Sequence, residues 1–109
     1  MPTTAYIRRV DDAHFDAEVL ESELPVVVDF TAAWCGPCRV MDPVVAELAA
    51  ERDDVRFVKL DVDQNLATAA RYGVMSMPTF MVFKNGAPVA TLRGSQPKHR
   101  LARDIDAAI

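Results

Sequence analysis

The chain has 109 residues, the size of a single domain, and we expect residues 1–109 to form one. Half of the residues are hydrophobic and 26% are charged, as in an ordinary soluble globular protein, and the formal net charge of −4 argues against nucleic-acid binding, which requires a basic face. Because no stretch is apolar enough for a signal peptide or a membrane span, we expect a soluble, cytoplasmic protein with no membrane contact.

Three elements are predicted before residue 31. Residues 5–8 suggest a short strand, and Asp11 or Asp12 can cap a helix that extends to about Glu21. Residues 26–30 read Val-Val-Val-Asp-Phe, a run rich in β-branched side chains that does not alternate with polar ones. This pattern is typical of a central strand buried on both faces of a sheet.

A long helix is predicted after the sequence Trp34-Cys35-Gly36-Pro37-Cys38. Apolar side chains recur three, four and seven positions apart between Met41 and Leu48, which places them on one face of a helix. Pro43 lies inside this pattern, and we expect it to kink the helix.

The rest of the chain predicts a strand, a helix, a hairpin and a final helix. The expected elements are a strand over residues 55–62, a helix over 65–72 ended by Gly73, strands over 79–84 and 89–92 joined by an Asn85-Gly86 turn, and a last helix opened by Ser95 and Pro97. Since the first three strands alternate with helices, we expect them to be parallel, with an antiparallel hairpin after them. The predicted fold class is α/β, with a single mixed five-stranded sheet flanked by four helices on both faces.

The only two cysteines, Cys35 and Cys38, are separated by two residues. Residues three apart lie on the same side of a helix, with their Cβ atoms about 5–6 Å apart. A small adjustment of the first turn therefore allows a disulfide that forms and breaks easily. A bridge this short closes almost no loop, and its purpose is therefore redox chemistry rather than stability. The free N–H groups and positive dipole at the helix start favour the thiolate of Cys35, which makes it the attacking sulfur, and Cys38 then resolves the mixed disulfide.

Two other readings of the cysteine pair are weaker. A structural zinc site needs four ligands, but the only histidines, His14 and His99, are isolated from the cysteines in the sequence. An inert buried pair is disfavoured because Trp34 and the Gly36-Pro37 dipeptide suggest a surface loop. We therefore expect no metal.

Four motifs, in this order, make the sequence resemble the thioredoxin family. They are Val28-Asp29-Phe30, Trp34-Cys35-Gly36-Pro37-Cys38, Met77-Pro78-Thr79 and Phe83-Lys84-Asn85-Gly86, and together they cover essentially the whole chain. The resemblance implies a thioredoxin fold and a protein disulfide reductase that has a redox-active Cys35–Cys38 disulfide and no bound cofactor. Relatives that oxidise or isomerise disulfides usually carry dipeptides other than Gly-Pro between the cysteines.

The resemblance also implies roles for three residues outside the cysteine motif. Pro78 is expected to be a cis proline that lies against the disulfide. A carboxylate such as Asp29 is costly to bury in a strand, and burial raises its pKa. In the family the matching residue serves proton transfer at the second cysteine, and Lys59 lies on the neighbouring strand, where it can pair with Asp29. A buried ion pair without a catalytic part is the alternative.

A docking surface for client proteins is implied at positions that ring the site in the family. These positions are Trp34, Gly36, Pro37, Met75, Ser76, Met77, Gly94 and Ser95. Two residues depart from common family patterns: Thr31 replaces an aromatic residue of some members, which leaves Trp34 as the only tryptophan, and Met75 occupies a position that is often polar or basic.

The leading hypothesis is a monomeric reductase of client disulfides. The resemblance implies re-reduction by a flavin-dependent, NADPH-driven thioredoxin reductase. Two alternatives are a binding module that uses the docking surface without electron transfer, and an oxidase or isomerase of disulfides.

Overall fold

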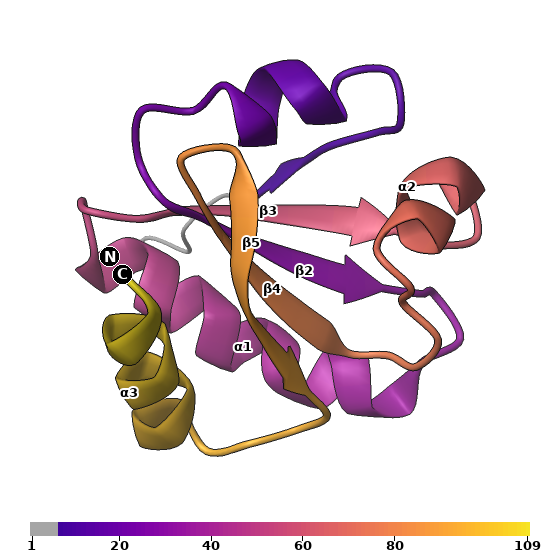
Figure 1. The fold of residues 1–109 in the computed structure, drawn as a ribbon. Coiled ribbons are helices and arrows are strands. Elements are labelled where there is room, and N and C mark those ends of the chain that lie inside the picture. Colours follow the sequence, from indigo (N-terminus) through magenta and orange to yellow (C-terminus); the bar gives the residue numbers. More distant parts are fainter. Residues whose placement is uncertain (1–6) are drawn as a thin grey trace.

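The computed structural model describes residues 7–109, which form a five-stranded sheet covered by helices (Figure 1). The strands are β1 (Arg8–Arg9), β2 (Val26–Thr31), β3 (Arg56–Asp61), β4 (Thr79–Lys84) and β5 (Ala87–Arg93); the helices are η1 (Asp16–Leu20), α1 (Gly36–Glu51), α2 (Leu66–Arg71) and α3 (Lys98–Ala108). The strand expected over residues 5–8 lies outside the described residues except for its end, which falls in β1.

The sheet has the order β1-β3-β2-β4-β5, with β2 at its centre. β1 and β2 are both parallel to β3, whereas β4 runs antiparallel to β2 and β5. The predicted mixed sheet with parallel first strands and an antiparallel hairpin is therefore confirmed. Every residue from Val26 to Phe30 is buried, as the unbroken apolar run predicts for a central strand.

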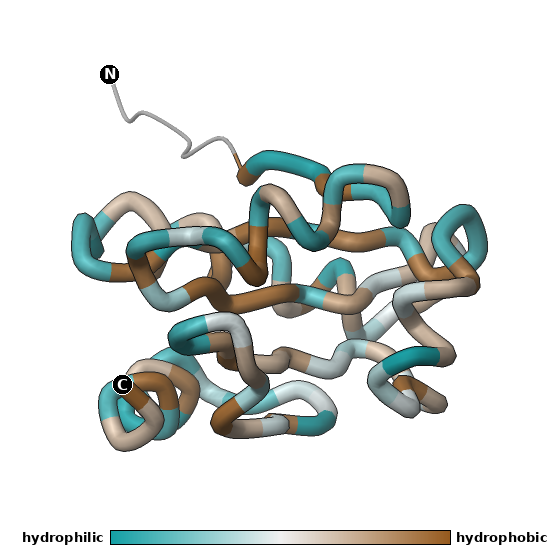
Figure 2. Tube along the Cα trace, turned by 45° about the horizontal axis from the view of Figure 1, so that its top comes forward, coloured by the Kyte–Doolittle hydropathy of each residue, from teal (hydrophilic) through white to brown (hydrophobic). Residues whose placement is uncertain are grey.

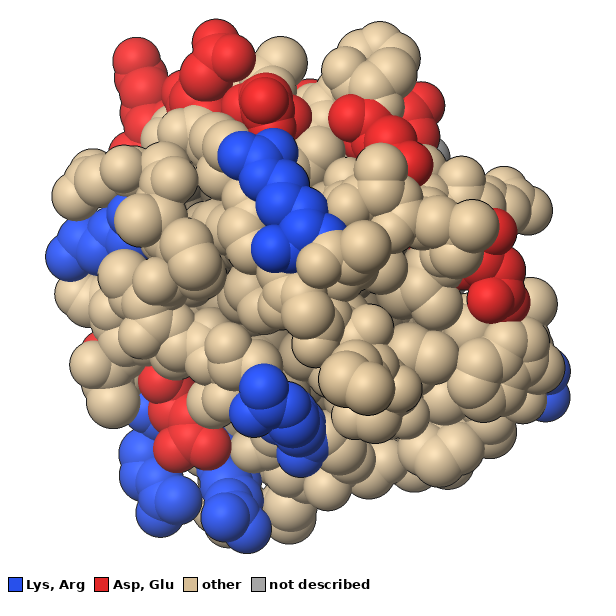
Figure 3. Space-filling view, turned by 45° about the vertical axis from the view of Figure 1, so that its right-hand side comes forward, with Lys and Arg blue, Asp and Glu red and all other residues tan. Residues whose placement is uncertain are grey.

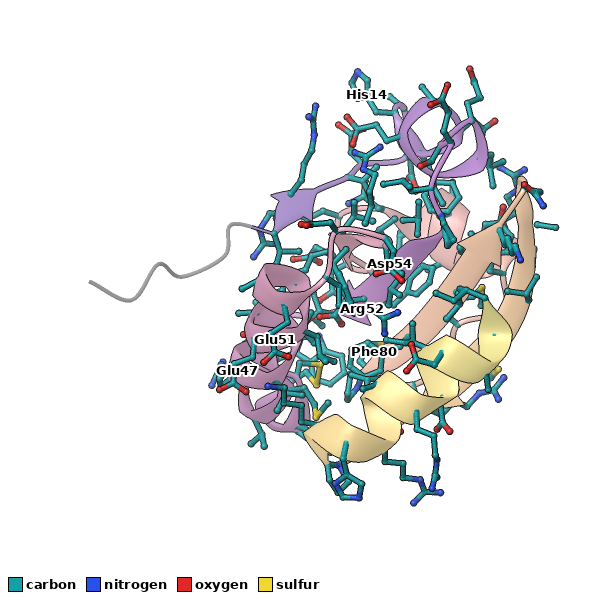
Figure 4. The ribbon with its side chains drawn as sticks, turned by 90° about the vertical axis from the view of Figure 1, so that its left-hand side faces the viewer. His14, Glu47, Glu51, Arg52, Asp54 and Phe80 are labelled. Carbon is teal, nitrogen blue, oxygen red and sulfur yellow. A yellow bond between two sulfur atoms is a disulfide. The ribbon has the colours of Figure 1, made fainter. Side chains whose placement is uncertain are left out.

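Apolar side chains fill both faces of the sheet. Buried residues of α1 and α3, including Val45, Leu101 and Ile105, pack with Val27 and Phe80 on one face. Figure 4 shows Phe80 pointing into the interior on that side. The other face is covered by η1 and α2. Its cluster contains Phe15, Val19, Val28, Ala69 and both cysteines. Along the trace, hydrophobic residues concentrate on the inner strands (Figure 2). Helices on both faces bury the central strand and fix its carboxyl end, where the candidate site lies.

The first helix is shorter than predicted. η1 spans only Asp16–Leu20, with an N–H···O bond from Glu21 to Asp16 that is typical of a π-helical turn. Asp11 accepts a hydrogen bond from the backbone N–H of His14 at 2.9 Å, so its carboxylate closes the preceding turn instead of capping a long helix.

Asp12 caps a different helix from the one predicted. Its carboxylate accepts hydrogen bonds from the backbone N–H and the hydroxyl of Thr68, at 2.9 and 2.6 Å, and from the N–H of Ala67 at 3.3 Å. Asn65, the residue that precedes α2, uses its side chain elsewhere: its oxygen accepts from the N–H of Asp12, and its amide donates to the Asp61 carbonyl. The segment after β1 therefore satisfies the free donors of α2.

The remaining boundaries follow the predicted turn chemistry. Gly73 ends the α2 region with φ +66°, and Asn85 and Gly86 both have positive φ, as a tight hairpin turn requires. Pro97 precedes α3, and its carbonyl accepts the N–H groups of Arg100 and Leu101. α1 continues through Pro43 as one element, and the kink expected there stays a prediction.

Candidate active site at the start of helix α1

The cysteine pair lies where the central strand leads into α1. The N–H of Cys35 donates to the Ala32 carbonyl at 3.1 Å, which turns the chain after β2. Cys35 is the N-cap residue of α1, and Pro37 lies in the first turn, where a missing N–H costs nothing. Cys35 and Cys38 form a disulfide, with their Cα atoms 5.3 Å apart.

The helix start directs hydrogen-bond donors at the first sulfur. The Cys35 Sγ accepts the backbone N–H of Cys38 at 3.1 Å. The unpaired N–H groups of a first turn, together with the helix dipole, stabilise negative charge at this position. A thiolate released at Cys35 therefore finds electrostatic support that Cys38, inside the helix, does not share.

The sulfur atoms lie beneath a surface of exposed neighbours. Cys35 and Cys38 are only 2% and 3% exposed, whereas Trp34 is 66% and Met75 93% exposed. Gly36 and Pro37 are exposed as well. The surface loop expected from the sequence is present. Both cysteines are nevertheless almost completely buried beneath its exposed residues.

Trp34 is anchored by a hydrogen bond that sequence reasoning did not foresee. Its indole N–H donates to the Asp63 carboxylate at 2.8 Å, and the backbone N–H of Asp63 in turn donates to the Asp61 carboxylate at 2.9 Å. These contacts join the residue before Cys35 to the segment after β3. Nothing local in the sequence marks Asp63, because the contact joins positions 29 residues apart.

The segment before β4 supplies the second group of predicted site residues. The Met77–Pro78 peptide bond is cis. The Pro78 carbonyl accepts the N–H of Gly94 at 2.9 Å, and Met77 packs against the core cluster that contains both cysteines. Ser76 is exposed, and so is Ser95. Residues 76–78, Gly94 and the cysteine pair are thus linked through backbone contact and the shared core.

Asp29 is the buried acid of the site. It lies in β2 between Lys59 of β3 and Phe80 of β4, and it is 3% exposed. Burial raises the pKa of Asp29 to about 7; the positive charges of Lys59 and Arg9 oppose this rise, and the negative charge of Asp42 adds to it. A group with this pKa can both take and release a proton near neutral pH.

Lys59 occupies the expected strand position but has a different partner. Its register neighbour is Asp29, yet its ammonium forms an ion pair with Asp42 of α1, with an Nζ–Oδ1 distance of 2.8 Å. Cys38, Asp42 and Lys59 line one cavity of about 190 Å³. Sequence analysis missed Asp42, although its position four residues after Cys38 places it on the same side of the helix.

Neither a metal-binding cluster nor a membrane-spanning helix is found in the described part of the chain. Within residues 7–109, no group of three or more His, Cys, Asp or Glu side chains is arranged to hold a metal ion. Over the same residues, no helix is both long and apolar enough to cross a membrane.

A five-stranded mixed sheet that carries a Cys-Gly-Pro-Cys disulfide at the start of a helix defines a thiol–disulfide oxidoreductase. Residues 6–107 match the family described as thioredoxin. The chain is 51% identical to thioredoxin 1 of Synechococcus elongatus, over 89% of this chain and 92% of that protein. It is 48% identical to the thioredoxin of Streptomyces clavuligerus, over 89% and 91%, and 46% identical to that of Haemophilus influenzae, over 92% and 94%.

The chain belongs to the thioredoxin family. It is a protein disulfide reductase, with Cys35–Cys38 as its redox-active disulfide.

Proposed function

We propose that Cys35 is the nucleophile that attacks client disulfides and that Cys38 resolves the resulting mixed disulfide. The observation that carries this assignment is the position of the Cys35 sulfur at the N-cap of α1, where it accepts the N–H of Cys38. A helix dipole contributes about 0.3–2 kcal/mol, which lowers a thiol pKa by up to about 1.5 units. Cys35 is therefore the more acidic thiol of the reduced pair.

The reaction consists of two thiol–disulfide exchanges. The Cys35 thiolate attacks one client sulfur, a Cys35–client bond forms, and the other client sulfur leaves as a thiolate. The Cys38 thiolate then attacks the Cys35 Sγ, which restores the Cys35–Cys38 bond and releases the second client thiolate. The client gains two electrons, and the cysteine pair loses two.

Asp29 is the proton acceptor for Cys38 in the second exchange, and Lys59 supports it. The support for this role is a buried carboxyl whose pKa of about 7 matches the pH at which the exchange must run. Cys38 and Lys59, the strand neighbour of Asp29, line the same cavity, which also supports a connection between the second cysteine and this part of the sheet.

Client proteins dock on the uncharged surface that surrounds the disulfide. The residues of this docking surface are Trp34, Gly36, Pro37, Met75, Ser76 and Ser95, which are exposed, Met77 and Gly94, which are partly exposed, and Pro78, which is buried. An exposed apolar patch beside a nucleophile suits a protein partner, and the 93% exposure of Met75 is the strongest such feature. An extended client segment would pair with the backbone of Met77, because the carbonyls of Ser76 and Pro78 already accept hydrogen bonds from Thr79 and Gly94.

The electron donor is an NADPH-dependent flavoprotein thioredoxin reductase, and the protein acts as a monomer in the cytoplasm. Each turnover leaves the cysteine pair oxidised, so the cycle requires an external two-electron donor. A reducing compartment keeps client thiols from closing again.

Insulin reduction in the presence of a dithiol reductant tests the cysteine roles. The unmodified protein should catalyse the reaction, and Cys35→Ser should abolish it. Reduced Cys38→Ser, mixed with insulin after removal of the reductant, should accumulate a mixed disulfide that is visible by mass spectrometry. Alkylation of the reduced protein should occur first at Cys35. Faster alkylation and a lower pKa at Cys38 would reverse the two roles. Client binding that survives in the double serine variant, without any reduction by the unmodified protein, would instead identify a binding module.

The redox potential separates reductase from oxidase chemistry. Trp34, the only tryptophan, directly precedes Cys35, so its fluorescence should rise on reduction, because a nearby disulfide quenches an indole more than thiols do. Titration of this signal against a dithiol buffer should give a midpoint near the established thioredoxin value of about −270 mV. A midpoint above about −200 mV would identify an oxidase or isomerase instead.

A further inference from the structure

The ion pair between Lys59 and Asp42 changes the setting of the buried acid. In the register of the sheet, Lys59 is the direct neighbour of Asp29, but its ammonium lies 2.8 Å from the Asp42 carboxylate on α1. The Lys59 side chain is largely buried, with 16% exposure, whereas that of Asp42 is 43% exposed. The lysine therefore spans from the sheet to the rim of the cavity that Cys38 also lines.

The charged and titratable groups that neighbour Asp29 or line the cavity beside Lys59 come from three elements. β3 supplies Lys59 and, at its end, Asp61. β1 supplies Arg9, the register neighbour of Lys59. α1 supplies Asp42, together with Cys38 and Arg39 of the cavity wall. On its other side, Asp29 faces Phe80 of β4, which carries no charge. Asp42 is thus the acid that sits on the same helix as Cys38 and also holds the lysine next to Asp29.

We propose, building on the proton-transfer role proposed above for Asp29, that Asp42 is a positioning residue: it holds the Lys59 ammonium at the cavity rim and thereby sets the basicity of the carboxyl that takes the proton of Cys38. The step it serves is the second exchange. The proton on Cys38 Sγ passes to the Asp29 carboxylate, the new thiolate bonds to Cys35 Sγ, and the client sulfur leaves with the electron pair of the broken bond.

Two effects of Asp42 act in the same direction. Its own negative charge disfavours a second negative charge at Asp29, and its ion pair draws the positive charge of Lys59 away from Asp29. The electrostatics agree: Asp42 raises the pKa of Asp29, and Lys59 lowers it. Without the Asp42 carboxylate, Lys59 is free to approach Asp29. Both changes would make Asp29 a weaker base that ionises at lower pH.

The test is an NMR titration of the Asp29 carboxyl carbon in the reduced protein, with Asp29→Asn to assign the signal. Asp42→Asn keeps the shape of the side chain and removes its charge, so the pKa of Asp29 should fall by about one unit. Asp42→Glu restores the charge and should restore most of the original value. Glu47→Gln is the matched control: Glu47 lies on the same helix, points away from the sheet (Figure 4) and contacts Lys98, so its loss should leave Asp29 unchanged.

A second readout follows the exchange itself. A chromogenic aromatic disulfide (a dithiobis-nitrobenzoate) releases one aryl thiolate when Cys35 attacks it and a second when Cys38 resolves the adduct. The acid limb of the second release should move to lower pH in Asp42→Asn by the same amount as the Asp29 titration. The first release should keep its pH profile, because it depends on Cys35.

The outcomes separate this inference from the proposed function. An Asp29 pKa that stays the same or rises in Asp42→Asn overturns the inference. An unchanged effect of Asp42→Asn in a Lys59→Met background also overturns it, because Asp42 would then act by its own charge and not by holding the lysine. A lowered Asp29 pKa with an unmoved second release supports the positioning by Asp42 but overturns the proton-transfer role of Asp29.

Discussion

The carboxyl group of Asp29 lies in the middle of the central strand, where the fold excludes water from nearly every side. A structural role gives no reason for an acid there, since a neutral side chain of the same shape would avoid the cost of burial. The raised pKa is the measure of that cost. The proton-transfer role proposed above for Asp29 would account for an acid at this position.

The free-energy cost of burying Asp29 should appear as a pH dependence of the stability of the protein. Below about pH 4, Asp29 is protonated in both the folded and the unfolded chain. Between that value and the folded pKa of about 7, only the folded chain holds the proton, so the free energy of unfolding falls as pH rises. At about 1.4 kcal/mol per unit, the fall reaches up to about 4 kcal/mol and levels off above the folded pKa.

Asp29→Asn should remove this fall and leave a more stable protein at neutral pH, although disulfide exchange becomes slower. Urea unfolding at a series of pH values measures the effect. Asp53→Asn, which changes an exposed acid in the turn before β3, should follow the unmodified protein. Parallel stability curves for Asp29→Asn and the unmodified protein would show that Asp29 titrates at the same pH in the folded and the unfolded chain.

Among the elements, α2 depends most on a distant residue. It has only six residues, and Asp12, more than 50 positions away, accepts the free N–H groups of its first turn. These hydrogen bonds lower the pKa of Asp12, and those from Thr68 have the largest effect. Their stabilisation is therefore present at neutral pH and is lost as pH falls through that lowered pKa.

Asp12→Ala should expose the start of α2 to solvent. The amide protons of Ala67 and Thr68 should lose protection from hydrogen exchange, and the urea midpoint should fall with an unchanged m-value. Asp11→Ala is the matched control, because the hydrogen bonds that Asp11 makes to residues 7–109 stay within its own turn, to the N–H and ring of His14. Equal protection of α2 in both variants would show that the cap contributes nothing.

Local patterns predicted most of the elements, and long-range pairing set the rest. The run from Val26 to Phe30 and the Asn85-Gly86 turn carry their own conformational preferences, so β2 and the β4–β5 hairpin are found where expected. The cap of α2 and the partner of Lys59 depend on atoms brought together only by the folded chain. The cysteine pair was predictable because the residues that determine its chemistry are close together in the sequence.

At the scale of the whole molecule, contacts at both of its ends hold helix α1 in place. α1 presents both cysteines to the core while its far end is tied to α3 by Arg52, which pairs with Asp106 at 2.6 Å. The helix that carries the redox pair is therefore fixed at both ends. Reduction of the disulfide opens only a four-residue loop and should leave the far-UV circular dichroism unchanged.

The neutrality of the proposed docking surface has a consequence for how client proteins approach it. Trp34, Gly36, Pro37 and Met75 are exposed and uncharged, and Figure 3 shows wide uncharged areas between separate charged side chains on the face that it presents. Diffusional encounter with clients therefore receives little electrostatic steering, and dissolved salt has little to screen. Raising potassium chloride tenfold should change kcat/KM for insulin by less than roughly twofold. A steep decline with ionic strength would place the point of first contact on charged side chains elsewhere. If clients dock on this surface, the protein should reduce them at similar rates in dilute and in salty solution, and it should treat acidic and basic clients nearly alike.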